Sequence, residues 1–365
     1  MAKRKVLIAG ASGLVGYAAA RRLAARDDAE VVAVSRRAPL RAEGVRHLPV
    51  DLTDRERCAE AFGAMPGITH LVYAAVHERP GLVAGWLEEE QVRTNESMLR
   101  NLFEPLERAS GGTLRHVTLL QGTKAYGAHV RPIEIPARED RSEHRGHPNF
   151  YWRQEEYIRG KQAGRDWRWT IFRPQIIFGM STGSAMNLIP AIGTYGAILR
   201  EQGRPLLYPG GPGNVLEAVD ADLLARAIDW AGEAPEAADR IFNVTNGDVF
   251  TWRGVWPAIA DALGMEPGPD KPLPLGEWMP QYGPEWDAIR GKYGLAAPSL
   301  ADFVGKGFDY ADFCMACGAG SEAPPPAIVS TIRLRRAGFH EVMDTEDMLV
   351  KWIREFQRER LLPAA

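Results

Sequence analysis

Hydrophobic and polar positions follow two alternating periodicities along the first half of the chain. Short runs rich in Val, Ile, Leu and Thr predict buried strands. These runs are Val6–Ala9, Val31–Ser35, Arg46–Val50, Thr69–Ala75, Leu114–Gln121 and Trp169–Arg173. Segments with helical spacing lie between them, at Glu56–Phe62, Val83–Arg108 and Tyr151–Gly164. The alternation predicts an α/β fold with a doubly wound parallel sheet of the Rossmann type, whose ligands bind at the carboxyl ends of the strands. Arg240–Val244 predicts a further strand at one edge.

The pattern changes after Phe178, where Gly, Pro, Trp and Met become more frequent. Helical spacing recurs at Met186–Gln202, Ala221–Glu233, Gly254–Leu263 and Asp344–Arg360. Two proline-rich stretches, Pro267–Pro274 and Pro324–Pro326, predict loops. A chain of 365 residues is long enough for two domains. We therefore expect a nucleotide-binding domain over residues 1–178, to which 214–245 return, and a smaller discontinuous substrate cap over 179–213 and 246–365.

Composition and charge narrow the class of protein. The chain is 45% hydrophobic and 25% charged, with a net charge of −3, so neither nucleic acid nor a membrane is an expected partner. No apolar run approaches the roughly 20 residues of a membrane span. Met1–Lys5 leads directly into the first predicted strand and leaves no room for a signal peptide. We expect a cytoplasmic protein, with a homodimer as a candidate assembly.

The three cysteines agree with a reducing compartment. Cys58 is isolated, whereas Cys314 and Cys317 form a Cys-x-x-Cys pair that suits a redox function or half of a zinc site. No second pair completes a set of metal ligands. We interpret these cysteines as small buried residues and expect no bound metal.

A glycine-rich turn joins the first predicted strand to the next helix, Leu14–Arg26. Gly10 permits the tight turn, Gly13 lets the backbone approach a pyrophosphate, and Gly16 lets the helix pack closely on the strand. The helix N-terminus adds free N–H groups and a positive dipole end. The Gly-x-x-Gly-x-x-Gly spacing is typical of short-chain dehydrogenases, although an ordinary turn without a ligand remains the alternative. The residues expected to bind a dinucleotide here are Gly10, Ser12, Gly13, Leu14, Val15 and Gly16.

The end of the second predicted strand favours NADP(H). Enzymes that prefer NAD place an Asp or Glu about 20 residues after the glycine turn, to bind the ribose 2′-hydroxyl. Here Ser35 is followed by Arg36 and Arg37, and guanidinium groups pair well with a 2′-phosphate. Two solvated surface arginines are the alternative interpretation. The further expected cofactor contacts are Asp51 at the adenine edge, Leu52, Ala74, Gln121 and Ile177.

The chemistry of short-chain dehydrogenases usually depends on a Tyr-x-x-x-Lys pair, in which the ammonium lowers the pKa of the phenol from about 10. Tyr157 and Lys161 have this spacing. Tyr157 nevertheless lies six residues beyond Tyr151, about 9 Å further along the helix and away from the crevice. Tyr151 is better placed, but Glu155 holds its +4 position, and a carboxylate there would raise the pKa of the phenol.

A second cation follows the fifth predicted strand, in Gln121-Gly-Thr-Lys124-Ala-Tyr126-Gly127. Extended dehydrogenases place a catalytic Ser or Thr a few residues before Tyr-Gly, and that position is Gly122 here. Lys124 brings a cation to the same pocket, so a lysine from the strand end can replace the one from the helix. A surface lysine is the alternative. Asn95 is a candidate brace for Lys124 or for a water, and an ordinary polar residue on the helix face is the favoured alternative.

Taken together, the motifs resemble the progesterone 5β-reductase and iridoid synthase-like family over nearly the whole chain. The motifs that carry this resemblance are Gln121–Lys124, Asn149–Trp152, Phe172–Pro174 with Ile177–Gly179, Asp220–Leu223 and Phe242–Trp252. The resemblance implies that Lys124 and Tyr151 form the catalytic pair. It also implies NADPH-dependent reduction of the activated C=C bond of an α,β-unsaturated carbonyl compound, a small-molecule substrate.

Two departures from the family pattern bear on the substrate pocket. Trp152 stands where the family often has Tyr, and Met180-Ser-Thr replaces Phe-Ser-Pro, so a steroid substrate does not carry over. The candidate pocket residues are Tyr126, Trp152, Met180, Met186 and Phe339.

Three other functions remain open at this point. One is an NADP-dependent carbonyl reductase or secondary alcohol dehydrogenase, which product analysis would separate from a C=C reductase. A sugar-nucleotide epimerase would normally have Tyr-x-x-x-Lys at the crevice and an acidic residue for NAD. A non-catalytic NADPH-binding regulator would have no need of a proton donor. The fold by itself does not choose among them.

Overall fold

The computed structural model describes residues 3–41, 43–79 and 84–365. It divides into two compact units. The first unit comprises Met1–Gln175, Asp222–Val244 and Val329–Glu341. The second comprises Ile176–Ala221, Thr245–Ile328 and Val342–Ala365.

This division differs from the expected one at residues 176–178, 214–221, 245 and 329–341. Residues 214–221 belong to the second unit, where β9 (Ala218–Asp220) pairs in parallel with β7 (Ile176–Phe178). Residues 329–341 belong to the first unit, because α12 (Ile332–Arg336) packs on β10 (Arg240–Val244).

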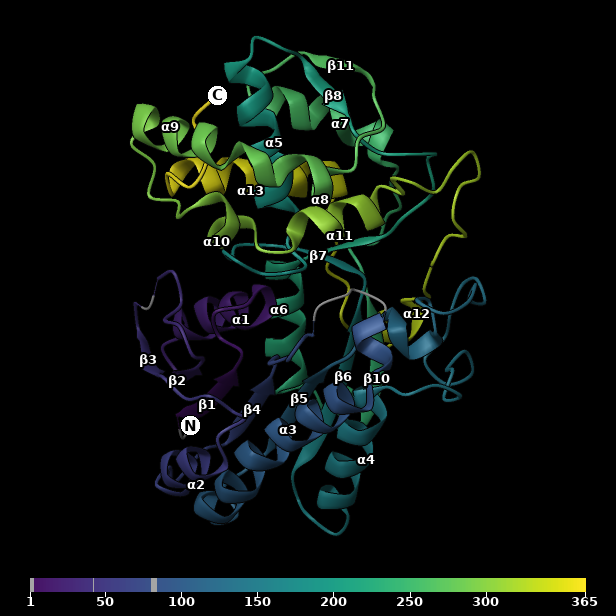
Figure 1. The fold of residues 1–365 in the computed structure, drawn as a ribbon. Helices are drawn as coiled ribbons and strands as arrows, with labels where there is room; N and C mark the ends of the chain where they lie inside the picture. The colour runs from purple at the N-terminus through teal and green to yellow at the C-terminus, as the bar shows by residue number, and fades with distance from the viewer. Residues whose placement is uncertain (1–2, 42, 80–83) are drawn as a thin grey trace. The chain divides into compact units, whose positions relative to one another are not determined.

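The first unit is built on a seven-stranded sheet with the order β10-β6-β5-β4-β1-β2-β3 (Figure 1). All six pairs of neighbouring strands run parallel. The bounds of the strands not yet given are β1 (Arg4–Ala9), β2 (Ala29–Val34), β3 (Val45–Leu48), β4 (His70–Tyr73), β5 (His116–Leu120) and β6 (Arg168–Pro174). The strand order reverses at β1, which has β2 on one side and β4 on the other, and such a reversal marks the ligand crevice of an open α/β sheet. The predicted doubly wound parallel sheet is confirmed, and β10 is its predicted edge strand.

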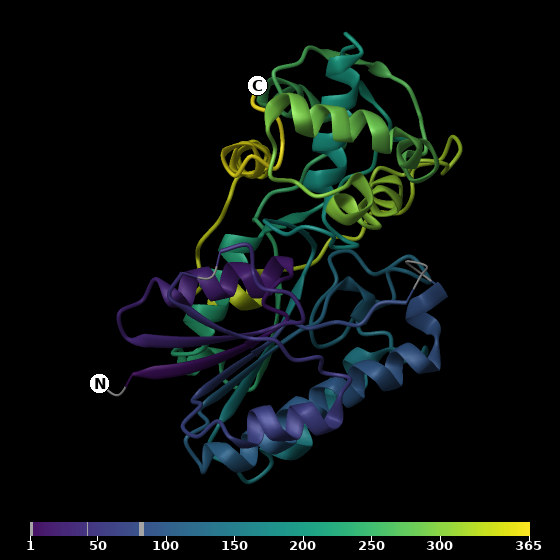
Figure 2. The same cartoon turned by 60° about the vertical axis from the view of Figure 1, so that its left-hand side comes forward.

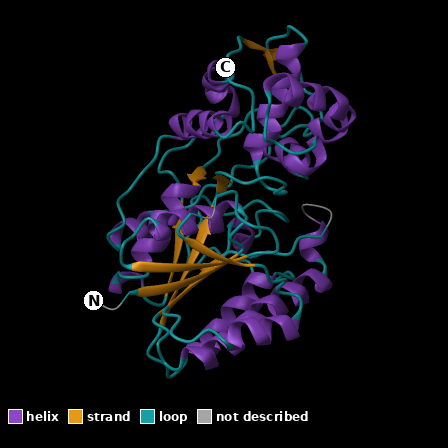
Figure 3. Cartoon of the chain, turned by 90° about the vertical axis from the view of Figure 1, so that its left-hand side faces the viewer, coloured by secondary structure: helices purple, strands orange, loops and turns teal. Residues whose placement is uncertain are grey.

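Helices cover both faces of this sheet (Figures 2 and 3). On one face lie α2 (Arg55–Gly63), α3 (Glu89–Ser110) and α4 (Phe150–Gln162). On the other face α1 (Leu14–Ala24) is tied to α6 (Ala221–Ala231) by an ion pair of 2.9 Å between Arg22 and Asp229.

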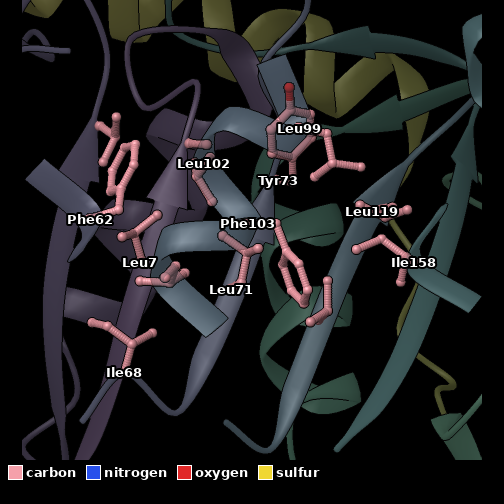
Figure 4. Packing of buried hydrophobic residues seen from close by; sticks show 14 of the residues in the cluster. Leu7, Phe62, Ile68, Leu71, Tyr73, Leu99, Leu102, Phe103, Leu119 and Ile158 are labelled. Carbon is pink, nitrogen blue, oxygen red and sulfur yellow. The ribbon is translucent and has the colours of Figure 1, made fainter. Parts of the chain in front are cut away.

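The core of the first unit lies between the sheet and α2, α3 and α4. Leu7, Leu71 and Leu119 from three strands are fully buried and belong to one cluster with Phe103 of α3 and Ile158 of α4 (Figure 4). Burying such a side chain contributes about 1.5–3 kcal/mol relative to leaving it exposed. The apolar strand runs therefore fix the sheet, and its carboxyl edge is free to carry polar residues.

The beginning of the long helix differs from the expectation. The helical pattern predicted a start at Val83, which lies outside the described residues, whereas α3 begins at Glu89. A short 3₁₀ helix, η1 (Ala84–Leu87), precedes it. A second 3₁₀ helix, η2 (Thr123–Tyr126), follows β5.

The second unit is mainly helical. Its helices are α5 (Leu188–Glu201), α7 (Trp252–Ala262), α8 (Leu275–Trp278), α9 (Gly283–Tyr293), α10 (Leu300–Val304), α11 (Gly307–Cys314) and α13 (Thr345–Arg358). The loop predicted over Pro267–Pro274 is wrong in its first half, because β11 (Pro267–Asp270) pairs with β8 (Leu206–Tyr208). A two-stranded sheet has only edge strands, and edge strands tolerate proline. The helices α8 to α12 were not predicted, since glycine and proline interrupt the region and all of them except α9 have eight residues or fewer.

None of the helices in the described part of the chain combines the length and apolar composition of a membrane span. Within the same described ranges, no group of three or more His, Cys, Asp or Glu is arranged to hold a metal ion.

Candidate active site

The glycine turn has the geometry of a phosphate cradle. Gly10 has φ +82°, and a Cβ there would lie 2.6 Å from the carbonyl oxygen of Ala74. A Cβ at Gly16 would lie 2.2 Å from the carbonyl oxygen of Gly10. Gly13 is the N-cap residue of α1 and makes no side-chain hydrogen bond to the first N–H groups of that helix. Glycine is therefore required at both packed positions, and the first turn of α1 fits a pyrophosphate.

The end of β2 presents the two arginines of the predicted 2′-phosphate site. Ser35 is buried, and its hydroxyl donates a 2.6 Å hydrogen bond to the carbonyl of Arg37, which folds the turn back on itself. Arg36 and Arg37 are exposed. The backbone N–H of Thr53 and, more weakly, the Arg36 guanidinium hold the pKa of Asp51 below its usual value. Arg36 and Asp51 therefore belong to one electrostatic neighbourhood, which fits the adenosine end of a dinucleotide.

The phenol of Tyr151 lies against Gly122, at the carboxyl end of β5. A Cβ built at Gly122 would be 3.3 Å from the Tyr151 hydroxyl oxygen and 3.5 Å from the carbonyl oxygen of Pro174. The position that carries a catalytic hydroxyl in extended dehydrogenases is therefore next to this phenol. Tyr151 opens α4 within its first turn, which places the phenol at this end of the helix.

Asn149 joins the two predicted catalytic residues. Its side-chain oxygen caps α4 by accepting a 3.0 Å hydrogen bond from the backbone N–H of Tyr151. Its amide group donates a 3.2 Å hydrogen bond to the carbonyl of Lys124. Asn149 is 3% exposed, and its bond to Tyr151 is buried while its bond to Lys124 is partly buried. The structure thus ties the backbone of η2 to the start of α4.

Trp86 of η1 contacts both Lys124 and Tyr151. The Lys124 ammonium is 3.5 Å from the centroid of the Trp86 ring, a cation–π contact. The Tyr151 ring meets the same indole edge-on, with centroids 5.4 Å apart, and Phe150 packs on it at 4.7 Å. Trp86, Phe150 and Tyr151 belong to one buried cluster.

Glu78 brings a carboxylate to this cluster. Hydrogen bonds clamp the segment on both sides of it, since Asn95 binds both backbone groups of His77 at 2.8 Å and Gln91 accepts from the N–H of Arg79 at 2.7 Å. Asn95 therefore braces the Glu78 segment rather than Lys124 itself. Trp86 and the Lys124 ammonium both act to lower the pKa of the Glu78 carboxylate, against the effect of its burial.

Burial and two charges set the acidity of the phenol. Desolvation, followed by the Glu78 carboxylate, raises the pKa of Tyr151, while the guanidinium of Arg173 opposes the rise. Burial also raises the pKa of Glu78, and Lys124 acts in the opposite direction. The phenol therefore stays protonated across the neutral range and is a hydrogen-bond donor rather than a base.

The expectation that Glu155 would act on the phenol is corrected by its ion pairs. Its carboxylate is 3.0 Å from Arg159, 3.2 Å from Arg145 and 3.8 Å from the fully buried Arg173. Those guanidinium groups offset its charge, and the carboxylate that raises the pKa of Tyr151 is Glu78. Gln121, an expected cofactor contact, bridges Arg173 and Glu155 with hydrogen bonds of 2.7 and 3.0 Å.

The competing catalytic pair, Tyr157 and Lys161, faces α3. Tyr157 packs edge-on against Phe103 of α3 at 6.0 Å, with the Arg100 guanidinium 4.3 Å from its ring centroid. Lys161 forms an ion pair of 3.3 Å with Glu107, which also belongs to α3. These contacts fix the middle of α4 on α3. The tyrosine hydroxyl that lies next to Gly122 is that of Tyr151.

Three of the candidate pocket residues, Tyr126, Trp152 and Phe339, belong to the first unit. Tyr126 is fully buried and its hydroxyl donates to Asn243, which makes it part of the support of Arg173. Trp152 is 7% exposed with the Arg145 guanidinium 4.4 Å from its ring, and its indole N–H is buried without a described partner. Phe339 packs on Trp230 of α6 with centroids 5.7 Å apart.

The other predicted contacts belong to the second unit. Ile177 is the middle residue of β7 and pairs with Val219. Met180 is buried after that strand, and Met186 is half-buried just before α5.

Sequence reasoning missed the roles of Trp86, Glu78 and Asn149. Trp86 and Glu78 fall in the connection between β4 and α3, which carries no periodic pattern. Asn149 is the first residue of the Asn149–Trp152 motif. An asparagine directly before a helical pattern is a sequence signal for a helix N-cap.

Comparison with known proteins identifies the family of this chain. The sequence model of the NAD dependent epimerase/dehydratase family matches residues 6–245. The chain is 32% identical to (S)-8-oxocitronellyl enol synthase ISY2 of Nepeta racemosa, over 82% of this chain and 78% of the relative. It is 29% identical to (S)-8-oxocitronellyl enol synthase of Catharanthus roseus, over 86% of this chain and 82% of the relative.

Solved structures share the fold. Thermus thermophilus UDP-glucose 4-epimerase in complex with NAD superposes with a TM-score of 0.64 at 20% identity, covering 96% of this chain and 99% of that one. Thermotoga maritima UDP-glucose 4-epimerase with UDP-glucose gives a TM-score of 0.67 at 16% identity, covering 97% and 99%.

The chain therefore belongs to the NAD-dependent epimerase/dehydratase family of extended short-chain dehydrogenases/reductases, and within it to the predicted progesterone 5β-reductase and iridoid synthase-like group. The protein is therefore a nicotinamide-dependent enzyme.

Proposed function

We propose that this protein uses NADPH to reduce the activated C=C bond of a small α,β-unsaturated carbonyl compound. The observation that carries the proposal is the contact of the Tyr151 hydroxyl with Gly122, joined through Asn149 to Lys124. Relatives named as enol synthases support it, because hydride addition to the β-carbon of an enone or enal leaves an enol or enolate.

Tyr151 stabilises the charge that develops on the substrate. When bound, NADPH supplies a hydride to the β-carbon, and negative charge accumulates on the carbonyl oxygen. The raised pKa of Tyr151 keeps its proton in place, so the hydroxyl donates a hydrogen bond to that oxygen. One such donor typically contributes ~3–4 kcal/mol to transition-state stabilisation.

Lys124 contributes positive potential and, through Asn149, shares the backbone support of Tyr151. The Tyr-x-x-x-Lys arrangement gives that role to a lysine one turn along the helix, where this chain has Glu155. The enolate takes its α-proton from water in this proposal.

The preference for NADPH is part of the proposal. Its support is the exposed pair Arg36 and Arg37 after β2, where enzymes that prefer NAD have an acidic residue.

The experiment is an NADPH-oxidation screen over small enones, enals, quinones and steroids, with identification of products. We expect saturated carbonyl products from the wild type. Tyr151→Phe should lose about 100-fold or more in kcat while its Kd for NADPH stays unchanged, since one oxyanion donor is removed. The matched control is Tyr157→Phe, another buried tyrosine of α4, which should retain activity.

Each other outcome points to another function. An allylic alcohol as product would identify a carbonyl reductase. NADPH binding without turnover of any compound would favour a regulator. Full enone reduction by Tyr151→Phe would overturn the proposed role of the phenol.

A further inference from the structure

Trp86 contacts both residues of the predicted catalytic pair. Its indole face receives the ammonium 3.5 Å from the ring centroid, and its ring packs in a T-shaped arrangement with the Tyr151 ring, with centroids 5.4 Å apart. The ring is 4% exposed, so the cation–π contact is largely shielded from water and is stronger than a surface contact of this type.

The cation–π contact orders the side chain of a lysine that starts from η2. Its four-carbon stem is flexible, and holding the ammonium in one place costs rotamer entropy. In the Tyr-x-x-x-Lys arrangement the lysine and the tyrosine share one helix, which fixes their spacing. Here the two residues come from different elements, and the indole contacts both.

We propose that Trp86 is a positioning residue that holds the Lys124 ammonium beside Tyr151 through its indole face. This inference rests on the proposed function, in which Lys124 supports the phenol. Trp86 contacts Lys124 rather than the reacting atoms, so its contribution to turnover passes through the lysine.

The first test is a double-mutant cycle between Trp86 and Lys124, measured as kcat and KM for enone reduction. Trp86→Leu removes the π face, and we expect kcat to fall about ten-fold, with KM and the Kd for NADPH within two-fold of wild type. Trp86→Phe keeps an aromatic face and should recover most of the loss. In the Lys124→Met background, Trp86→Leu should cost less than two-fold more, because the two residues act as one unit.

A matched control separates this role from plain packing. Trp169 is another buried tryptophan of the first unit, and its ring carries the Arg159 guanidinium at 4.7 Å. Trp169→Leu also removes a buried indole and a cation–π contact, so it should lower the melting temperature while leaving kcat near wild type.

The second test does not depend on activity. Reductive ¹³C-methylation of the lysines and NMR of the free protein place the Lys124 methyl groups, assigned by their loss in Lys124→Met. A position over an indole face shifts these resonances upfield, and the shift should disappear in Trp86→Leu and persist in Trp86→Phe.

The outcomes distinguish the two proposals. If Lys124→Met loses activity while Trp86→Leu keeps it, or if the two losses multiply, the positioning role of Trp86 is overturned and the proposed function stands. An unshifted Lys124 resonance in the wild type also overturns it. Full activity of Lys124→Met contradicts the role of the lysine in the proposed function, and the inference fails with it.

Discussion

The hydroxyl oxygen of Tyr151 lies 3.3 Å from the point at which Gly122 would carry a Cβ. Gly122 has an extended backbone, with φ −178°, so alanine there adds no backbone strain. Its methyl group would instead displace the phenol by a few tenths of an ångström. We predict that Gly122→Ala lowers kcat about ten-fold, because small misplacements of a reacting group are costly, and leaves the Kd for NADPH unchanged.

Gly160 provides the control for this substitution. It lies inside α4, and a Cβ there would have no heavy atom within 4 Å. Gly160→Ala should stabilise the protein by up to about 1 kcal/mol without changing kcat. Equal turnover of Gly122→Ala and wild type would show that the phenol acts elsewhere.

Asn149 is predicted to couple the two catalytic residues. Serine caps helices as well as asparagine does, but its side chain is too short to reach the carbonyl of Lys124. Asn149→Ser should therefore keep the free energy of unfolding within about 1 kcal/mol of wild type and lower kcat several-fold. Denaturant unfolding and steady-state kinetics measure the two effects. A loss of stability without a change in kcat would limit Asn149 to the cap.

The pH dependence tests the charge of Glu78. Its carboxylate raises the pKa of Tyr151, so removing the charge lowers that pKa. Glu78→Gln should therefore move the alkaline limb of kcat, along which the phenol loses its proton, to lower pH. Glu56→Gln, an exposed glutamate of α2, should leave the profile in place. A limb that stays fixed or moves to higher pH in Glu78→Gln would contradict the assignment.

The two arginines after β2 are predicted to select the cofactor. Each charge-assisted hydrogen bond to a phosphate contributes about 1.5–3 kcal/mol, and 1.4 kcal/mol is a factor of ten in affinity. Arg36→Ala with Arg37→Ala should weaken NADPH binding roughly 100-fold and leave NADH binding nearly unchanged, as measured by fluorescence titration. Arg108→Ala, in the last turn of α3, is the control. Parallel losses for both cofactors would assign the arginines a role other than 2′-phosphate recognition.

The arrangement of the first unit was predictable because apolar periodicity and glycine spacing are local signals. Strand runs such as Val6–Ala9 and the helix after Gly13 lie where the pattern places them. The preference for Tyr151 over Tyr157 followed from the rise along one helix, and the structure turns Tyr157 toward Phe103.

The contacts that complete the site were not predictable in the same way. Trp86 and Glu78 reach Lys124 and Tyr151 through tertiary packing of a segment without periodicity. The effect of Glu155 was misjudged because Arg173 and Arg145, which offset its charge, come from other segments. Strand β11 was missed because proline is read as a loop signal and edge pairing of so short a segment leaves no pattern.

The position of the transferred hydride tests whether Tyr151 supports reduction of a C=C bond. A cyclic enone is reduced with NADPH deuterated at C4, and the label in the product is located by NMR. We predict a saturated ketone with deuterium at the β-carbon, formed by the wild type and nearly abolished in Tyr151→Phe. An allylic alcohol with deuterium at the carbinol carbon would contradict this chemistry.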